Sequence, residues 1–339
     1  MTVAVVILNY NGKHFLSKFL PSVVSYSVGH KVIIADNGSD DGSVELIESD
    51  FPDVILIRIN ENKGYTGGYN EALKQVHADV YVLVNTDIEV TEGWIDPIVE
   101  LMSNDNSIAA CQPKLLSYNN KNIFEYAGAA GGYIDFLGFP FCRGRLFQAM
   151  EDDSGQYNDI KQVFWASGAC FFIRSDVFHR LGGFDEDFFA HMEEVDLCWR
   201  FKNSGYKIMS VPESEVYHVG GSIISYGSAP KTYRNYRNSL ILLMKNLPLD
   251  QLIWKFPYRL FLDGIAFFHL LFRGDVLLAF TIIKSHWHFH VKTLYWLRKR
   301  AEVQKLSKKG TEATYYPQSI VWKYFINRVR KFSDLNWKY

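Results

Sequence analysis

Short runs of β-branched and other apolar residues alternate with segments of helical spacing over the first 84 residues, and this alternation restricts the fold more than any other feature. Runs of this composition are typical of strands buried on both faces, so we expect strands at 3–8, 31–35, 54–59 and 79–84. The spacing between them predicts helices within 15–24, 44–47 and 69–76. Strands and helices that alternate in this way form βαβ units. The sequence therefore predicts an α/β fold with a mostly parallel central sheet flanked by helices.

Polar and glycine-rich loops follow all four predicted strands. They are the segments 9–12 (NYNG), 36–43 (DNGSDDGS), 60–70 (NENKGYTGGYN) and 85–87 (NTD). Ligands of parallel sheets bind beyond the carboxyl ends of the strands, so we expect these loops to line one site. Turn residues alone would explain any single loop, and for residues 40–43 a helix cap is the simpler interpretation.

Three later segments have distinct patterns. Glycine and aromatic residues are frequent at 127–147, which predicts irregular strands or a mobile loop over the site. The run VFWASGACFFI at 163–173 predicts a buried strand. Residues 193–203 predict a helix with Leu197 and Phe201 on its inward side, because these two residues are four apart.

Beyond residue 247 the sequence becomes more apolar and more basic. Charged or polar residues interrupt the apolar runs, at Asp263, His269, Arg273 and Asp275, so no run reaches the roughly 18 residues that span a bilayer. From residue 284 onward, 13 Lys and Arg stand against 3 Asp and Glu, a net charge of +10. We expect amphipathic helices on an anionic membrane surface, with a helical subdomain, a solvated basic face or a dimer interface as alternatives. A metal site at His286, His288 and His290 is disfavoured.

Composition sets broad limits on the class of protein. A chain of 339 residues with 48% apolar content can bury a large core, and its net charge of −1 favours no nucleic-acid partner. The four cysteines have no metal-binding spacing, and we expect them to be reduced and buried. The sequence begins Met-Thr and enters an apolar run without a basic leader, which predicts a cytoplasmic protein. Neither a Walker lysine pattern nor a dinucleotide fingerprint is present, which argues against a kinase or a dehydrogenase.

A cluster of carboxylates with a later histidine points to an enzyme. The sequence GGFDE at 182–186 precedes EEVDLCWR at 193–200, and His218 follows a short apolar run. Such a group suits acid–base and metal chemistry. The helix dipole would by itself favour an acid at the start of a helix, but it does not account for the surrounding motif. Asp196 and Arg200 are four apart and are expected to form a structural pair.

Taken in order, these motifs resemble those of glycosyltransferase family 2, the inverting enzymes of the GT-A fold, and especially its rhamnosyltransferase-like branch. The resemblance extends from residue 3 to about residue 248. The motifs that carry it are VVILNYNG, IIADNGSDDGS, NKGYTGGYN, VNTD, SGACFFIR, GGFDEDFF, EEVDLCWR, His218 and RNSLILLMKN.

The resemblance implies a nucleotide-sugar site in the first half of the chain. Its residues are Asn9, Tyr10, Asp36, Gly64, Gly67, Gly68, Asn70 and Asp87. Asp36 would accept hydrogen bonds from the base or ribose, and Tyr10 would pack on the base. The glycines would let the backbone approach the ligand and would open a helix whose first amides point outward. Turn capping by Asp36, a buried tyrosine and a plain glycine turn are the structural alternatives.

The resemblance also implies a divalent metal, manganese or magnesium. Asn85-Thr86-Asp87 occupies the family's DXD position, so Asp87 is the principal acidic ligand and His218 completes the site. Asparagine in place of the first acid predicts weaker or more solvent-mediated metal binding. The alternatives are a helix-capping role for Asp87 and a structural role for His218.

Glu193 and Glu194 stand where the family usually has Glu-Asp, the second acid being the general base. Glu194 keeps the carboxylate but is one methylene longer, so Glu193 remains a candidate. The resemblance divides the chain into a GT-A catalytic domain at 1–247, with a nucleotide-binding half at 1–112 and an acceptor half at 113–247. A basic helical extension follows at 248–339.

The function implied is inverting transfer of a sugar from UDP-hexose or dTDP-rhamnose to a hydroxyl of a growing, lipid-linked cell-surface polysaccharide. The protein would lie at the inner face of the cytoplasmic membrane and contact it through the C-terminal helices. One alternative is a polyprenyl-phosphate sugar synthase. The other is a catalytically silent scaffold that binds nucleotide sugars. The donor, the acceptor, the linkage and the oligomeric state are left open.

Overall fold

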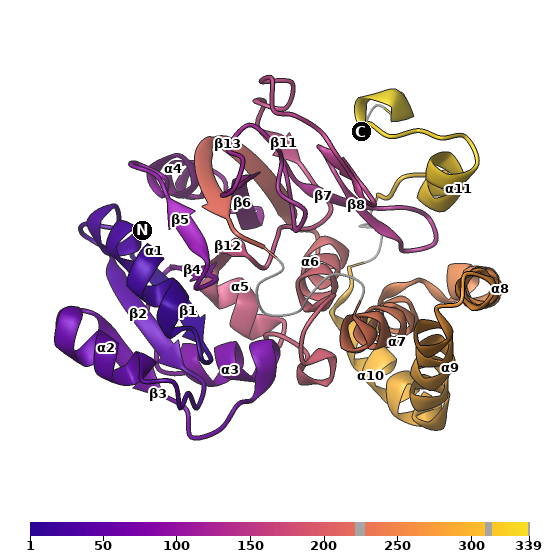
Figure 1. Ribbon diagram of the computed structural model, residues 1–339, viewed down its shortest axis with the longest axis horizontal. Helices are drawn as coiled ribbons and strands as arrows, with labels where there is room; N and C mark the ends of the chain where they lie inside the picture. Colours follow the sequence, from indigo (N-terminus) through magenta and orange to yellow (C-terminus); the bar gives the residue numbers. More distant parts are fainter. Residues whose placement is uncertain (221–227, 309–313, 338–339) are drawn as a thin grey trace.

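The predicted βαβ alternation forms one half of a nine-stranded sheet (Figure 1). The computed structural model describes residues 1–220, 228–308 and 314–337. Four strands run parallel in the order β3, β2, β1, β4, with bounds Ile55–Arg58, Lys31–Asp36, Val3–Asn9 and Val80–Val84. They are linked by α1 (Lys13–Ser25), α2 (Ser43–Asp50) and α3 (Gly64–Leu73). Every strand and helix expected in this half is present, although α3 begins five residues earlier than its spacing predicted.

The second half of the sheet is mixed. Strand β12 (Cys170–Arg174) lies antiparallel between β4 and β6 (Ile108–Ser117), and β13 (Lys207–His218) runs parallel to β6. Two short strands, β5 (Ile88–Val90) and β11 (Lys161–Gln162), are antiparallel to β13. The α/β fold is thus confirmed, with a parallel order that holds for β3–β2–β1–β4 and for β6–β13.

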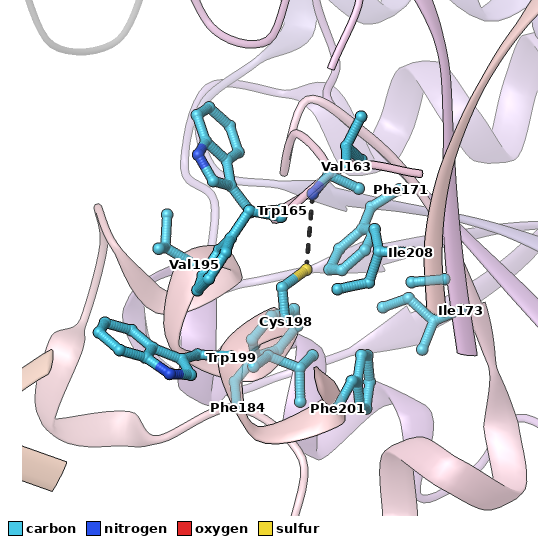
Figure 2. Packing of buried hydrophobic residues seen from close by; sticks show 14 of the residues in the cluster. Val163, Trp165, Phe171, Ile173, Phe184, Val195, Cys198, Trp199, Phe201 and Ile208 are labelled. Atoms are coloured by element: carbon cyan, nitrogen blue, oxygen red, sulfur yellow. Dashed lines mark hydrogen bonds between the residues drawn. The ribbon is translucent and has the colours of Figure 1, made fainter. Parts of the chain in front are cut away.

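The apolar run at 163–173 is a strand only from Cys170 onward, so the longer prediction is wrong. Residues 163–169 do not form a regular strand because their side chains and backbone contact several different elements. Trp165 forms an isolated bridge to Gly132 and donates its indole N–H to the Tyr133 carbonyl at 2.9 Å. Figure 2 shows Val163 and Trp165 packed with Cys198 and Trp199 of α6 (Glu193–Asn203). The run is apolar because it is buried, and burial does not require a strand.

Glycine and aromatic residues of the 127–147 segment form a second, four-stranded sheet, which confirms the irregular strands expected there. Its strands are β7 (Gly132–Ile134), β8 (Pro140–Cys142), β9 (Arg145–Leu146) and β10 (Ala149–Met150), all antiparallel. The C-terminal segment packs on this sheet. Ile320 donates its backbone N–H to Asp135 at 3.0 Å, and Phe332 donates to Glu151 at 2.8 Å.

Two apolar clusters cover the faces of the main sheet. One is closed by α1, α2 and α4 (Asp96–Asn104), and the other by α3, α5 (Ser175–Arg180) and α6 (Glu193–Asn203). The predicted bounds of α6 are confirmed, and Leu197 and Phe201 are fully buried on it. All four cysteines are free and buried, as expected. Asp196 and Arg200 form the predicted pair, with an Nε–Oδ2 distance of 2.9 Å.

In the described part of the chain, five α-helices follow the sheet: α7 (Ala229–Asn246), α8 (Leu249–Phe272), α9 (Val276–Val291), α10 (Thr293–Leu306) and α11 (Ile320–Phe325). A short 3-10 helix, η2 (Ser333–Leu335), comes after them. Helix α7 packs on α6 and also on α9 and α10, so it joins α6 to the helices that follow residue 247. In Figure 1, α8 and α9 lie at the edge of the molecule farthest from β3. None of the helices in the described residues has the length and apolar character that crossing a membrane requires. The domain boundary after residue 247 stays a prediction.

Candidate active site

One cavity of about 540 Å³ gathers the loops that follow the parallel strands with residues of the second half. Six of the predicted site residues line it: Tyr10, Gly64, Asp87, Glu193, Glu194 and His218. The other five lie outside its lining: Asn9, Asp36, Gly67, Gly68 and Asn70. Asn37, which was not singled out from the sequence, lines it as well. The cavity therefore lies at the carboxyl edge of the parallel strands, where the loop chemistry predicted a site.

Asn9 and Asp36 lie beneath this cavity as a buried pair that joins two loops. The Asn9 amide donates to Asp36 at 2.9 Å and to the hydroxyls of Ser39 and Ser43 at 3.0 and 2.8 Å. The second Asp36 oxygen accepts the backbone N–H of Ser39 at 3.1 Å. This network fixes the two loops relative to each other. In contrast, Tyr10 is 46% exposed at the cavity wall, where its ring is open to a ligand.

The glycine-rich segment serves close packing. Gly64 has a φ of +70°, and a Cβ there would lie 2.6 Å from the Phe189 ring. A Cβ on Gly68 would lie 2.7 Å from Leu8 of β1. The Phe189 carbonyl accepts the amides of Tyr65 and Thr66, at 2.9 and 3.3 Å. These first amides of α3 are therefore occupied in this conformation, and the outward-pointing donors expected from the sequence are not seen.

Asn70 pairs with the GGFDED loop. Its amide donates to the Phe184 carbonyl at 2.8 Å, and its oxygen accepts the Phe184 N–H at 3.0 Å. A Cβ on Gly67 would lie 2.9 Å from the Cβ of Lys63. Asn70 therefore braces α3 against this loop, and the role of Asn70 and Gly67 in binding a nucleotide sugar stays a prediction.

Asp87 and His218 form a buried pair at the ends of β4 and β13. His218 Nε2 lies 3.2 Å from Asp87 Oδ1, and Nδ1 lies at an ion-pair distance of 3.3 Å from Glu125. Burial disfavours the imidazolium, but Glu125 and Asp87 on either side raise the pKa of His218 to about 10. The raised pKa reflects the negative charge that the two carboxylates place on either side of the imidazole. Glu125 was missed from the sequence because it belongs to no motif.

The same pair fits a divalent cation. At metal–ligand distances of about 2.1 Å, two neighbouring ligands of one ion lie about 3 Å apart, close to the 3.2 Å found here. Glu125 stands behind His218, where a second carboxylate orients a metal-bound imidazole. Among the described residues, no group of three or more His, Cys, Asp and Glu side chains forms a complete metal centre. A cation here would need further oxygen ligands from a bound ligand or water.

Glu193 and Glu194 begin α6 at the cavity wall. Burial raises the pKa of Glu194 to about 7, and burial together with the neighbouring Glu194 raises the pKa of Glu193 well above its usual range. Oε2 of each glutamate is buried without a hydrogen-bond partner among the described residues. A carboxylate that titrates near neutral pH and has a free oxygen is suited to accept a proton from a substrate.

The loop before α6 is held in an uncommon conformation by α7. Phe189, His191 and Met192 have φ angles of +62°, +71° and +73°, which non-glycine residues rarely adopt. The Asn238 amide donates to the carbonyls of Phe188, Ala190 and His191, at 3.1, 3.1 and 2.7 Å. Asn238 thus fixes the entry to α6 and positions its glutamates. It lies in the RNSLILLMKN motif, which signalled its importance without indicating its role.

The family model for glycosyl transferase family 2 matches residues 4–182 of this chain. A relative in Mycobacterium tuberculosis (strain H37Rv), N-acetylglucosaminyl-diphospho-decaprenol L-rhamnosyltransferase, is 26% identical over 80% of this chain and 93% of its own length. A low-salt glycan biosynthesis hexosyltransferase of Haloferax volcanii is 20% identical over 70% of this chain and 74% of its length.

Two solved structures share the fold. GalNAc-T7 with UDP, GalNAc and Mn²⁺ superposes with a TM-score of 0.55 at 20% identity, over 70% of this chain and 47% of its own. The mannosyltransferase of Pyrobaculum calidifontis with GDP-Man and Mn²⁺ gives 0.51 at 14% identity, over 90% and 85%. Both are glycosyltransferases with the GT-A arrangement of a mixed sheet between helices, which is also the arrangement of this chain. Because the family model covers more than half of the sequence, the chain belongs to glycosyl transferase family 2 and is a glycosyltransferase.

Proposed function

We propose that this glycosyltransferase is an inverting, metal-dependent enzyme that moves a sugar from a nucleotide-diphospho-sugar to a hydroxyl of a lipid-linked cell-surface glycan. The observation that carries the proposal is that one cavity holds both the Asp87–His218 pair and Glu194, whose pKa is about 7. The names of the relatives support a lipid-linked acceptor, and the ligands of the two structures support a nucleotide-sugar donor with manganese.

In this proposal the donor lies along the loops that follow β1, β2, β3 and β4. Tyr10 packs on the nucleotide base, and Asp36 and Asn9 shape the floor beneath it. A divalent cation held by Asp87 and His218 would offset the negative charge of the departing nucleoside diphosphate. Manganese or magnesium fits because the site offers hard oxygen ligands and one imidazole.

Glu194 acts as the general base. It accepts the proton of the acceptor hydroxyl while that oxygen forms its bond to the anomeric carbon. The bond between this carbon and the diphosphate oxygen breaks, and the electron pair leaves with the nucleoside diphosphate. Attack from the face opposite the diphosphate inverts the anomeric configuration.

The experiment that tests this function is thermal unfolding with UDP, dTDP and GDP and their sugars, each with and without Mn²⁺. We expect one nucleotide family to raise the melting temperature, and to do so more strongly with Mn²⁺, because a ligand that binds only the folded state stabilises it. The Asp87→Asn variant should lose the manganese-dependent part of the shift. If no nucleotide changes the melting temperature with or without manganese, the proposed function is wrong.

We also propose that residues 248–339 form an extension that contacts the inner face of the cytoplasmic membrane. Apolar side chains at helical spacing are exposed along α8 and α9: Trp254, Tyr258, Phe261, Ile265, Phe268, Phe272, Val276, Phe280, Ile283 and Trp287. Exposed apolar patches of this extent mark interaction surfaces. Arg273, Lys284 and Lys292 are exposed on the same hairpin and just after it, which suits an anionic lipid surface.

Flotation with phosphatidylcholine vesicles containing phosphatidylglycerol tests the membrane contact. We expect the protein to float with these vesicles and the double variant Phe268→Glu, Phe272→Glu to stay in the soluble fraction, because each buried charge opposes insertion. Val28→Glu is the matched control, since Val28 is 85% exposed in the nucleotide half. A parent protein that ignores vesicles but forms a dimer, which the double variant breaks, would assign the surface to a second copy instead.

A further inference from the structure

Phe147 is an aromatic residue that lines the active-site cavity in a strained backbone conformation. Its φ is +49°, a value that bulky residues rarely adopt. Within the described chain, the other non-glycine residues with positive φ that line the cavity all belong to the loop before α6, which Asn238 fixes. Phe147 instead follows β9 of the second sheet. Strain that the surrounding structure maintains is concentrated at functional sites, so Phe147 is a candidate for contact with a ligand.

Two parts of the chain hold Phe147 in this conformation. Arg145, which is 7% exposed, donates to the Phe147 carbonyl at 3.0 Å. The rings of Tyr324 and Phe325 on α11 pack on the Phe147 ring, with centroid distances of 4.8 and 5.2 Å. The position of this cavity-lining ring therefore depends on the C-terminal segment.

Residues 314–337, here called the strap, are fixed to the second sheet on both sides of α11. Before α11, Tyr316 donates its backbone N–H to the Ile134 carbonyl at 2.9 Å. After α11, the Phe332 ring stacks on Tyr133 with a centroid distance of 5.5 Å. Figure 1 shows α11 beside this sheet. The strap thus presses α11 against the sheet from which Phe147 emerges.

The second sheet is also joined to α6, the helix that carries the proposed base. Trp165 forms an isolated bridge with β7 of this sheet. The next residue, Ala166, donates its backbone N–H to Cys198 Sγ of α6 at 3.5 Å (Figure 2). Phe147 and Glu194 line the same cavity. A sugar whose hydroxyl reaches Glu194 therefore lies in the cavity that the Phe147 ring borders.

The chemistry of this wall suits the sugar of an acceptor. The donor is proposed to lie along the loops that follow β1 to β4, which belong to the other sheet, so the wall made by the second sheet is left for the acceptor. The wall combines the ring of Phe147 with the polar groups of Arg145 and Tyr126. A pyranose has an apolar face of C–H groups and an edge of hydroxyls, and an apolar wall with a few polar groups matches both.

We propose that the Phe147 ring packs against the sugar that presents its hydroxyl to Glu194, and that the strap keeps this ring in place through Tyr324. This inference rests on the proposed function and adds to it a residue that binds the acceptor and a residue that positions it. Neither residue belongs to a motif of the family, and they come together only in the tertiary structure.

Transfer kinetics of the full chain test the proposal. The donor is the nucleotide sugar that thermal unfolding selects, and the acceptor probes are octyl glycosides of glucose, galactose, N-acetylglucosamine and rhamnose. We expect the parent protein to use at least one of them. Phe147→Ala should raise the KM for this glycoside about 10-fold, the loss typical of one aromatic contact, and should leave the KM for the donor unchanged.

Variants of α11 test the strap. Tyr324→Ala should raise the KM for the glycoside about 3-fold without changing the KM for the donor, whereas Tyr324→Phe should retain the parent values because it keeps the ring. Trp322→Ala is the matched control, since Trp322 lies on the same helix, is 59% exposed and is not one of the rings that pack on Phe147. A purely structural effect would reduce the amount of active enzyme, which lowers the apparent kcat and leaves both KM values as they are.

The outcomes separate this inference from the proposed function. If the parent uses a glycoside but Phe147→Ala changes only the KM for the donor, or neither KM, the proposal is wrong. If Phe147→Ala raises the KM for the octyl glycoside but not for the methyl glycoside of the same sugar, the ring contacts the lipid chain and the proposal is also wrong. Equal behaviour of Tyr324→Ala and Trp322→Ala overturns the role of the strap. A parent protein that binds nucleotide but uses no glycoside overturns the proposal as a whole, whereas a chain that binds no nucleotide contradicts the proposed function itself.

Discussion

Replacing Glu194 with glutamine is expected to lower transfer to a hydroxyl acceptor by about 10²- to 10⁴-fold, the contribution typical of a general base. The glutamine keeps the size and much of the hydrogen bonding of the glutamate but cannot take up the proton. Donor binding, measured by the manganese-dependent thermal shift, should be unchanged because Glu194 lies on α6, which carries none of the residues proposed to hold the nucleotide or the cation. Initial rates of nucleoside diphosphate release in the presence of acceptor measure the effect.

The pH dependence of kcat/KM provides a second test of Glu194 as the general base. A base acts only when it is deprotonated, so kcat/KM should fall as the pH is lowered through about 7, the pKa of Glu194 in the free protein. The rate should level off above that pH. The Glu194→Gln variant should lose this rise, since no carboxylate remains to titrate at that position.

Glu193→Gln is the matched control, because Glu193 differs from Glu194 by one position on the same helix. If Glu193→Gln produces the larger loss and removes the pH dependence, the base is Glu193. A Glu194→Gln variant with a near-normal rate would instead favour a polyprenyl-phosphate acceptor, whose phosphate oxygen is already ionised and needs no base.

The sequence predicts the nucleotide half of the fold well because its signals are local. Strands β1 and β4 are buried on both faces, and this produces the continuous apolar runs from which they were predicted. The edge strand β3 is only partly buried, but its run is mostly apolar as well. Helix α6 was placed at its observed bounds because a cluster of acids marks its first turn. The error at 163–169 arises because burial and strand formation both produce apolar runs.

The site is only partly predictable, since some of its residues are joined by contacts across long stretches of sequence. Asp87 and His218 stood out as isolated polar residues after apolar runs, and they meet in space. Glu125 and Arg145 lie in a segment without motifs, so nothing local distinguishes them from surface charges. The glycines were assigned to ligand approach, whereas Gly64 and Gly68 allow the close packing of α3 against Phe189 and Leu8. Only the tertiary structure separates these roles.

Replacing Lys245 with methionine is expected to lower the free energy of unfolding by roughly 3 kcal/mol, because it leaves a buried carboxylate short of its cation. Lys245 on α7 is 2% exposed, and its Nζ lies 2.5 Å from Asp185 and 3.0 Å from Asp196. Burial opposes ionisation of Asp185, but Lys245 and Lys299 hold its pKa well below the usual range. We place the loss at the lower end for a broken buried pair, because each carboxylate keeps one cation: Asp196 keeps Arg200 at 2.9 Å, and Asp185 keeps Lys299.

The ion pairs around Lys245 connect the extension to the loop at 185–192, which leads into α6. The Lys245→Met variant therefore tests function as well as the free energy of unfolding. Lys299 of α10 pairs with Asp185 and Asp187, and the Tyr295 hydroxyl donates to Asp187 at 2.7 Å. Asp187 lies in the loop that leads into Glu193 and Glu194, so weakening this network should also reduce the transfer rate.

Urea unfolding at fixed pH measures the stability change, and Lys207→Met provides the comparison. Lys207 pairs with Asp105 at 2.9 Å, but both side chains are more than a third exposed, Lys207 to 46% and Asp105 to 35%. Exposed pairs contribute at most about 1 kcal/mol, since water screens both charges. If Lys245→Met lowers the free energy of unfolding no more than Lys207→Met does, the buried ion pairs do not hold α7 to the loop at 185–192. The extension would then be an independent unit. A loss near the expected value, with a lower transfer rate, would mean that α7 and α10 brace the extension against the loop that leads into α6 and its proposed base, Glu194.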